Sequence, residues 1–224
     1  MEENKSVILP SILGCNFLTL EDQFNKMRNA GIEYLHYDVM DGNFVPNISF
    51  GESIFPLVHK CGFTEDVHLM VINPKDHVSK FADMGAKLVS FHVEVFKSEK
   101  ELLDLVAETR LKYPELKLGL AINPYTDDEL FFKVLSKFDF VLIMTVQAGY
   151  GGQSFIEFSL ERIKKTSKFI EENNLNCFIE VDGGINDKTA KLCYDLGARY
   201  FVSGSYLFIE NGTKIVEQIE KLNI

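Results

Sequence analysis

Apolar residues in this chain gather in short runs, separated by longer segments in which they recur at helical spacing. The runs are rich in β-branched and aromatic residues and are short, which favours strands over buried helices. We therefore predict eight strands, at residues 7–13, 33–40, 64–71, 88–94, 117–123, 140–146, 177–183 and 199–205. Most runs are apolar at nearly every position, which is typical of parallel strands covered on both faces.

The segments between the runs repeat apolar residues every three or four positions and predict helices. Leu20, Phe24 and Met27 fall on one side of a helix over 20–30. Several of these segments end at a glycine just before the next strand, as at Gly85, and glycine is the usual residue of a left-handed helix C-cap. The other predicted helices cover residues 75–85, 97–113, 127–138, 159–174, 187–197 and 213–223.

Eight strands, most of them followed by a helix, in 224 residues predict an α/β protein, a single-domain (β/α)8 TIM barrel over residues 1–224. A doubly wound open sheet is the alternative architecture. No Pro- or Ser-rich linker and no low-complexity segment interrupts the chain, which favours one domain. In such a barrel, function is expected where strands end and the following loops begin.

Composition and charge narrow the class of protein. The formal net charge is −10, which argues against a nucleic-acid partner but allows a small anion held by backbone N–H groups. No apolar run reaches the roughly 18 residues of a membrane span. Residues 1–11 hold too short an apolar stretch for a signal peptide. We therefore expect a cytoplasmic protein without a membrane partner.

The four cysteines, Cys15, Cys61, Cys177 and Cys193, show no CxxC spacing. Cys177 lies in an apolar strand-like run and Cys193 in a helical one. We expect reduced thiols, the last two in the core, and neither a disulfide framework nor a zinc site built on cysteine.

Polar side chains interrupt the apolar runs near the carboxyl ends of several predicted strands. His36, Asp38 and Met40 share one face of their strand, because residues two apart point the same way. Similar polar or sulfur-bearing residues end four other strands. Two imidazoles and two carboxylates in this set suit one divalent cation, such as Zn²⁺, Fe²⁺, Mn²⁺ or Co²⁺, and ligand type does not choose among them. The strand-end residues are Ser11, His36, Asp38, Met40, His68, Met70, Met144 and Asp182.

The other three histidines are not predicted to be metal ligands. His59 and His77 lie in helical patterns and are expected on the surface. His92 and Glu94, near the end of the fourth predicted strand, stay open between ordinary polar residues and a brace behind a metal ligand.

Glycine-rich loops follow the last three predicted strands. The segment TVQAGYGGQSF over 145–155 holds Gly149, Gly151 and Gly152, Gly183-Gly184 follows the seventh strand, and Gly204-Ser205 follows the eighth. Glycines let backbone N–H groups approach an anion closely, and late-strand loops are the common phosphate site of such barrels. We therefore predict a phosphate site beside the metal site.

These motifs resemble the ribulose-phosphate 3-epimerase family. The resemblance is carried by HYDVMDGNFVPN (36–47), DVHLMV (66–71), TVQAGYGGQSF (145–155), EVDGGI (180–185) and GS (204–205), in order along nearly the whole chain. One motif departs from the family. Where the family usually has Glu-Pro-Gly-Phe-Gly-Gly, this chain has Gln147-Ala148-Gly149-Tyr150-Gly151-Gly152, and loss of the proline raises the question of how stiff that loop is.

The resemblance implies an isomerase of the non-oxidative pentose phosphate pathway that interconverts D-ribulose 5-phosphate and D-xylulose 5-phosphate. It implies a metal held by His36, Asp38, His68 and Asp182, with the two aspartates as the acid–base pair. It implies phosphate contacts from Ser205 and the glycine loops, which include Tyr150. Relatives in the family form dimers or larger rings, so a homo-oligomer is expected.

This chemistry explains why a strand would carry such residues. Inverting C3 of a 2-ketose removes a proton from one face and returns one to the other, through an enediolate. A divalent metal at O2 and O3 stabilises the developing charge, and a carboxylate is needed on each face. His68 is expected to act as a ligand beside the substrate rather than as a base. Met40, Met70 and Met144 are expected to line the pocket, and Ser11 to bind a substrate hydroxyl, with core filling and a structural turn as the alternatives.

Three other functions compete with this one. An epimerase for a related ketose 6-phosphate would share the fold, the metal and the acid pair. A Mg²⁺-dependent decarboxylase would use oxygen ligands, so His36 and His68 argue against it. A barrel that binds sugar phosphates without catalysis would need no stoichiometric metal. Phe17, Phe44, Phe50 and Phe55 can cover the barrel mouth or a partner surface, and the sequence leaves this open.

Overall fold

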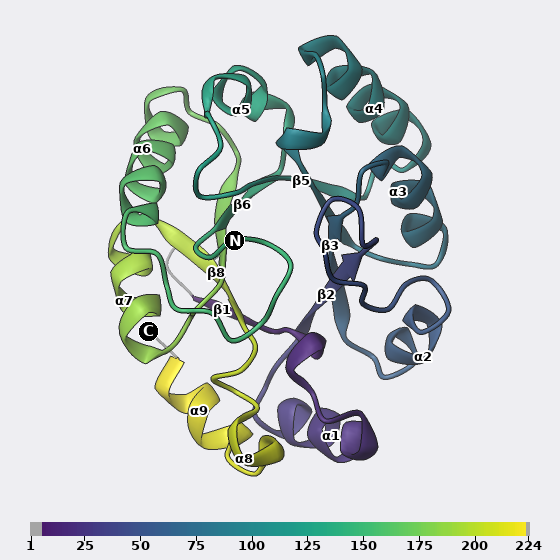
Figure 1. Cartoon of the computed structure of the whole chain (residues 1–224), viewed down its shortest axis with the longest axis vertical. Helices are drawn as coiled ribbons and strands as arrows, with labels where there is room; N and C mark the ends of the chain where they lie inside the picture. Colours follow the sequence, from purple (N-terminus) through teal and green to yellow (C-terminus); the bar gives the residue numbers. More distant parts are fainter. Residues whose placement is uncertain (1–5, 223–224) are drawn as a thin grey trace.

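The computed structural model describes residues 6–222, in which eight parallel strands are surrounded by helices (Figure 1). Neighbours along the chain pair from β2 to β8, and β8 pairs with β1. A parallel bridge between Ser11 and His36 joins the end of β1 to β2, so the sheet closes on itself. The predicted (β/α)8 barrel is confirmed, and the open sheet is excluded. The strands are β1 (Val7–Pro10), β2 (Tyr34–Met40), β3 (Thr64–Met70), β4 (Leu88–His92), β5 (Lys117–Ile122), β6 (Phe140–Met144), β7 (Phe178–Asp182) and β8 (Ala198–Ser203).

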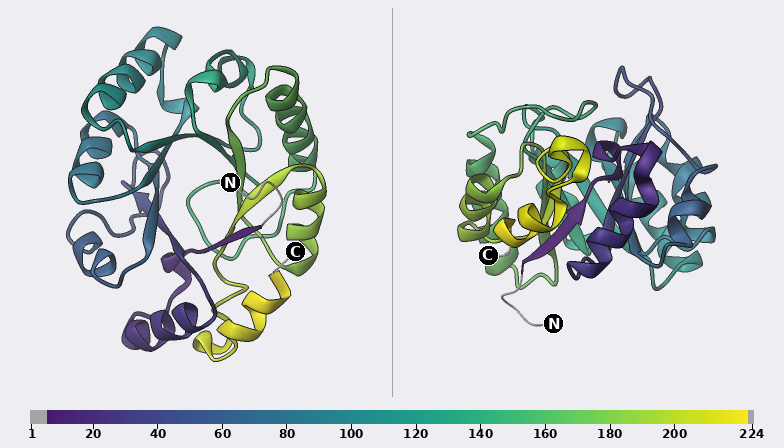
Figure 2. Two further views of the ribbon diagram at one scale, coloured as in Figure 1. Left: turned by 180° about the vertical axis from the view of Figure 1, so that it is seen from behind. Right: turned by 90° about the horizontal axis from the view of Figure 1, so that it is seen from below.

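Helices form a ring outside the barrel, and the loops that follow the strands project at one end (Figure 2, right). Within residues 6–222, none of the helices is both long and apolar enough to cross a membrane. The helices are α1 (Leu20–Asn29), α2 (Phe55–His59), α3 (Pro74–Asp83), α4 (Glu99–Lys112), α5 (Glu129–Val134), α6 (Ser159–Glu172), α7 (Asp187–Asp195), α8 (Ile209–Gly212) and α9 (Ile215–Leu222).

The structure corrects the predicted elements at several ends. The first predicted strand stops at Pro10, and Ile12–Gly14 forms a 3₁₀ turn. The fourth stops at His92, where Val93–Val95 turns in the same way. The short helices α2 and α8 were not predicted, because so few residues show no helical repeat.

The two faces of each strand meet different surroundings. On β2, Leu35, Tyr37 and Val39 are buried in the large apolar core between barrel and helices. His36 and Asp38 alternate with them and are equally buried, but inside the barrel. The polar pattern inside therefore depends on the pleat of the strand, whereas the outer face supplies the apolar packing.

Aromatic rings fill the amino-terminal end of the barrel. Phe140 stacks on Phe178 with ring centroids 5.2 Å apart, and Phe178 stacks on Tyr200 at 4.1 Å. Tyr34 meets Tyr200 edge-on at 5.8 Å. Gly119 makes room for this row, because a Cβ there would lie 2.3 Å from the Phe140 ring. Polar groups higher in the barrel therefore rest on a packed apolar floor.

The four phenylalanines predicted in the early loops, Phe17, Phe44, Phe50 and Phe55, differ in their burial and in what they contact. Phe55, the first residue of α2, is fully buried, and Phe50 is partly buried against the same core. Phe44 packs its ring on His92 at the barrel mouth, with centroids 4.6 Å apart. Phe17 is 50% exposed. These residues therefore do not form one continuous exposed surface.

All four cysteines are free, as expected. Cys193 is in the core as predicted, but Cys177 is only partly buried. Cys15, at the end of the first turn, is the second buried thiol instead. Cys177 lies just before β7 begins, where the chain has not yet entered the barrel wall.

Candidate active site

The carboxyl ends of the strands surround a cavity of about 890 Å³. His36 and His68 lie behind its lining and are fully buried. The structure therefore brings the residues predicted at strand ends and in the late glycine loops to one place. Those that line the cavity are Ser11, Asp38, Met40, Met70, Met144, Gly149, Tyr150, Gly151, Gly152, Asp182, Gly183, Gly184, Gly204 and Ser205.

Four side chains at this cavity can hold a metal ion. His36, Asp38, His68 and Asp182 each offer one atom, and these atoms lie within 4.8 Å of one another. Asp38 Oδ1 is 3.1 Å from His36 Nε2 and 3.2 Å from His68 Nδ1. Asp182 Oδ2 is 3.9 Å from His68 Nδ1. Two nitrogen and two carboxylate oxygen donors fit a divalent transition metal.

A second group of potential ligands, His36, Asp66 and Glu180, is fully buried. Asp66 Oδ2 lies 2.6 Å from His36 Nδ1, whereas Asp66 Oδ1 and both Glu180 oxygens have no hydrogen-bond partner within residues 6–222. Burial, and next the Asp66 carboxylate, raise the pKa of Glu180 well above its usual range. Neither Asp66 nor Glu180 lines the cavity. We therefore assign this group to support behind His36 rather than to a second metal.

Sequence reasoning did not single out Asp66 and Glu180. Each lies two residues before a predicted ligand, on β3 and β7, and shares its face. The same period of two that identified His68 and Asp182 also includes Asp66 and Glu180, one step closer to the start of each strand.

The two carboxylates at the cavity differ in acidity. Burial opposes ionisation of Asp38, but the charges and hydrogen bonds of His36 and His68 outweigh it and lower the pKa of Asp38 below its usual range. Burial, and next the charge of Asp38, raise the pKa of Asp182 to about 7. Opposed pKa shifts are typical of a pair in which one group accepts a proton and the other donates one.

The two buried imidazoles also differ. Burial lowers the pKa of His68 to about 4, which leaves a neutral ring able to bind a cation. For His36, Asp38 and Asp66 outweigh burial and raise the pKa well above its usual value.

Ser11 and the methionines lie at the cavity wall. The Ser11 hydroxyl donates to Asp38 Oδ2 at 2.6 Å and accepts from the N–H of Leu13 at 3.3 Å. Its proton is thus directed at a carboxylate rather than into the open cavity. Met40, Met70 and Met144 line the cavity and also pack together in a small apolar cluster. Both predicted roles of the methionines are therefore compatible with their placement.

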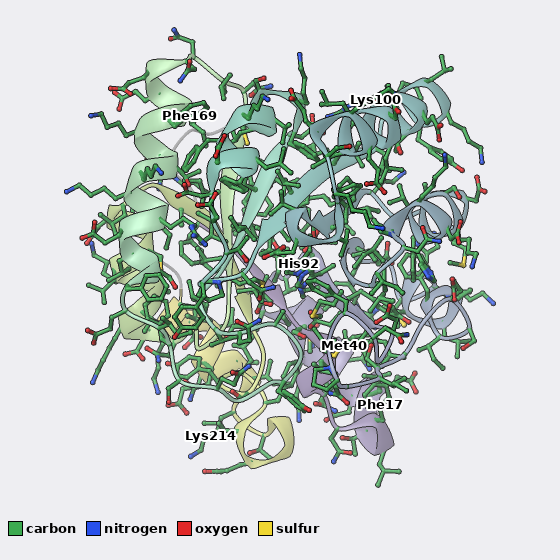
Figure 3. The ribbon with its side chains drawn as sticks, turned by 45° about the horizontal axis from the view of Figure 1, so that its top comes forward. Phe17, Met40, His92, Lys100, Phe169 and Lys214 are labelled. Carbon is green, nitrogen blue, oxygen red and sulfur yellow. The ribbon has the colours of Figure 1, made fainter. Side chains whose placement is uncertain are left out.

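The remaining histidines differ in burial, as their positions in the sequence predicted. His59 and His77 lie on the outside of the barrel, their side chains 44% and 27% exposed. His92 is fully buried directly behind His68, and its partner Glu94 is largely buried. Figure 3 shows His92 near the centre of the view. This placement favours the prediction that His92 and Glu94 support a metal ligand, here His68, over the alternative that they are ordinary polar residues.

The loop after β6 is fastened by hydrogen bonds. The Gln153 side chain donates to the carbonyls of Gln147 and Tyr150, at 2.7 and 2.8 Å. The Ala148 N–H donates to Asn123 Oδ1 at 3.0 Å, a bond that a proline at this position cannot make. These contacts answer the question raised by the missing proline, because they hold the loop over the cavity.

Glycines at the ends of β7 and β8 leave the backbone exposed to the cavity. Gly183 and Gly184 have φ values of +119° and +65°, and a Cβ on either would lie within 2.6 Å of a neighbouring atom. The N–H groups of Gly184 and Ser205 have no acceptor in the described part of the chain. Unpaired N–H groups that face a cavity are the features of an anion site.

Comparison with known proteins identifies relatives over nearly the whole chain. Residues 7–208 match the model of the ribulose-phosphate 3-epimerase family. The ribulose-phosphate 3-epimerase of Chlamydia pneumoniae is 35% identical over 223 residues, which cover 98% of this chain and 95% of the relative. That of Bacillus subtilis is 35% identical over 209 residues, covering 92% and 94%. That of Synechocystis is 38% identical over 208 residues, covering 90% and 87%.

Solved structures with lower identity share the fold alone. Mycobacterium tuberculosis tryptophan synthase aligns with a TM-score of 0.66 at 12% identity, over 98% of this chain and 92% of that chain. The Campylobacter jejuni tryptophan synthase α-subunit aligns with a TM-score of 0.63 at 18% identity, over 99% and 96%. These matches support the barrel architecture.

Proposed function

Because this chain belongs to the ribulose-phosphate 3-epimerase family, we propose that it interconverts D-ribulose 5-phosphate and D-xylulose 5-phosphate with two carboxylates, Asp38 and Asp182. The chain is an isomerase of this family. The observation that carries the mechanism is the pair itself. Asp38 lies near the end of β2 and Asp182 at the end of β7, two strands that β1 and β8 separate in the barrel, and both carboxylates line one cavity.

Each carboxylate has one part in the proton transfers. Asp38 is ionised at neutral pH and accepts the C3 proton from one face of the ketose. The C3–H electron pair moves toward C2, and the carbonyl oxygen takes the charge of an enediolate. Asp182, in its protonated form, donates a proton to the opposite face of C3. In the reverse direction the roles exchange, and the two groups reset by proton exchange with solvent.

His36, Asp38, His68 and Asp182 would hold the divalent cation. The fit rests on their donor set and on its convergence within 4.8 Å. When bound, the cation supplies Lewis-acid stabilisation of the charge on the substrate oxygens, which is worth several kcal/mol, roughly. The chain's own contribution is to hold both carboxylates rigidly beside C3 and to keep Met40, Met70 and Met144 as walls that offer no proton.

The phosphate would lie at the glycine end of the cavity. Gly183, Gly184, Gly204 and Ser205 line that end, and their backbone can approach an anion without a side chain in the way. The loop with Gly149, Tyr150, Gly151 and Gly152 would cover the substrate from the side of β6. Because the acid pair and the glycine loops lie at the mouth of a single barrel, we propose that residues 1–224 act as one catalytic domain.

A hydrogen-exchange experiment in D₂O tests the two-carboxylate mechanism. The wild-type protein should place deuterium at C3 of both ketose 5-phosphates. In Asp38→Asn and Asp182→Asn, interconversion should fall by about 10²–10⁴, the usual contribution of a general acid or base. The carboxylate that remains should still exchange the C3 proton of one epimer, a different epimer in each variant.

Metal content and circular dichroism of each variant are measured alongside, with metal supplied in excess. Near-native interconversion in either variant would exclude a two-carboxylate mechanism. Exchange of the same epimer by both variants would place both carboxylates on one face and would also exclude it.

A further inference from the structure

Behind His68, two further side chains continue a line of contacts away from the cavity. His68 Nε2 lies 2.8 Å from His92 Nε2, and His92 Nδ1 lies 3.0 Å from Glu94 Oε2. Both imidazoles are fully buried, and their rings stack with centroids 5.0 Å apart. At the other end of the line, His68 Nδ1 faces Asp38 and Asp182.

With a cation at His68 Nδ1, only one arrangement of hydrogens satisfies this line when each ring carries one. An ionised carboxylate accepts hydrogen bonds and does not donate them, so the Nδ1–H of His92 donates to Glu94. His92 Nε2 is then a bare acceptor for the Nε2–H of His68. The Nδ1 lone pair of His68 is left to face the cavity carboxylates, which is the form in which imidazole binds a cation.

The structure holds Glu94 so that one oxygen points at His92. The backbone N–H of Asn123 and the hydroxyl of Thr126 both donate to Glu94 Oε1, each at 2.6 Å. Arg162 in turn donates to the carbonyls of Asn123 and Thr126, again at 2.6 Å. Oε1 is thus occupied, and Oε2 is left for His92.

One other contact to His92 is weaker. The side-chain amide nitrogen of Asn123 lies 3.4 Å from His92 Nδ1, longer than a good hydrogen bond. Its orientation follows from the other end of the amide, where Asn123 Oδ1 accepts the N–H of Ala148. The shorter contact to a charged acceptor, Glu94, therefore decides which ring nitrogen of His92 carries hydrogen.

We propose that Glu94, acting through His92, is a positioning residue that holds His68 in the tautomer competent to bind the catalytic cation. The other histidine ligand has a matching support, because Asp66 lies directly behind His36 at 2.6 Å. The two supports differ in reach: one carboxylate is adjacent to its ligand, and the other acts across a second imidazole. This inference rests on the proposed metal role of His68.

The test compares Glu94→Gln with a matched control, Glu52→Gln. Glu52 also faces a histidine, with Oε1 3.0 Å from His77 Nδ1, but on the outside of the barrel. Zn²⁺ affinity is measured by competition with a chromophoric chelator, with circular dichroism to verify folding. Glu94→Gln should weaken Zn²⁺ binding about 10–100-fold, as loss of support behind a metal ligand usually does. The control should stay within about twofold of wild type, as expected of a surface change without contact to the site.

A spectroscopic readout separates positioning from general stability. Long-range ¹H–¹⁵N spectra of the Zn²⁺-loaded protein should show His92 with hydrogen on Nδ1 and His68 with hydrogen on Nε2. In Glu94→Gln the His92 Nδ1–H resonance should move upfield, because a charged acceptor has been replaced by a neutral amide. Hydrogen on Nε2 of His92 in the wild type, or unchanged Zn²⁺ affinity in folded Glu94→Gln, would overturn the proposal.

If Glu94→Gln does not fold, His92→Phe provides the same test. A phenyl ring keeps the ring contacts with Phe44 and His68 but gives the His68 N–H no acceptor, so Zn²⁺ affinity should again fall. His68→Ala shows whether a negative result means that His68 is not a metal ligand or that Glu94 does not position it through His92. Unchanged Zn²⁺ affinity in His68→Ala would remove His68 from the metal site, and with it the basis of this inference.

Discussion

Replacing Ser11 by alanine tests how the site holds its proposed base. The Ser11 hydroxyl donates to Asp38 Oδ2 at 2.6 Å, and both residues are buried. The sequence led us to expect that this hydroxyl binds the substrate. In the structure its proton is directed at Asp38, so Ser11→Ala should disturb the carboxylate more than substrate binding.

The size of the effect follows from the type of hydrogen bond. A buried hydrogen bond to a charged group is worth about 1.5–3 kcal/mol, and each 1.36 kcal/mol is tenfold in rate. Loss of the bond frees Asp38 to rotate away from the position in which it meets the C3 proton. We therefore expect kcat of Ser11→Ala to fall roughly 10–150-fold by this arithmetic, with KM within about twofold.

Ser49, in the loop that follows β2, provides a matched control. Its hydroxyl donates to the backbone carbonyl of Asp38 at 2.7 Å and accepts the N–H of Met40 at 2.9 Å, without contact to the carboxylate. Ser49→Ala should lower the free energy of unfolding by about 1 kcal/mol, the usual net value of such a bond, and change kcat much less. Steady-state kinetics and urea unfolding of both variants give the two quantities.

Two outcomes would refute this reasoning. A raised KM with unchanged kcat in Ser11→Ala would show that the hydroxyl binds substrate, as first expected from the sequence. Equal losses of kcat in Ser11→Ala and Ser49→Ala would show that the contact acts only by supporting β2.

Two further predictions concern the barrel floor and the acid response. Gly119→Ala should cost about 1–3 kcal/mol by overpacking against Phe140, and adding Phe140→Leu should recover part of that cost; additive losses in urea unfolding would contradict the steric explanation. Burial opposes ionisation of Glu94, but its hydrogen bonds and His92 outweigh it and lower its pKa from 4.5 to about 2. The resulting stability, up to about 3 kcal/mol, is complete above pH 4.5 and lost as pH falls toward 2. Unfolding curves of Glu94→Gln should therefore be flatter across this pH range than those of wild type, and parallel curves would rule out the depressed pKa.

The order of elements was readable from the sequence because it depends on local periodicity. Strands that are buried on both faces show continuous apolar runs, and helices between them repeat every three or four residues. The alternation of two along β2 also places His36 and Asp38 on one face, whatever the fold around them. Once the strands are parallel, their carboxyl ends gather at one mouth, so Asp182 on β7 was expected beside them.

The partners of these residues were decided by the tertiary structure. Ser11 could be placed at the mouth from the sequence, but its hydrogen bond to Asp38 depends on how β1 meets β2 where the barrel closes. The relay from His68 through His92 to Glu94 requires the register between β3 and β4. Local periodicity determines which face a side chain takes. Small differences in the distances between side chains on different strands determine which group donates a hydrogen bond to which. Those distances depend on the register, closure and packing of the whole barrel.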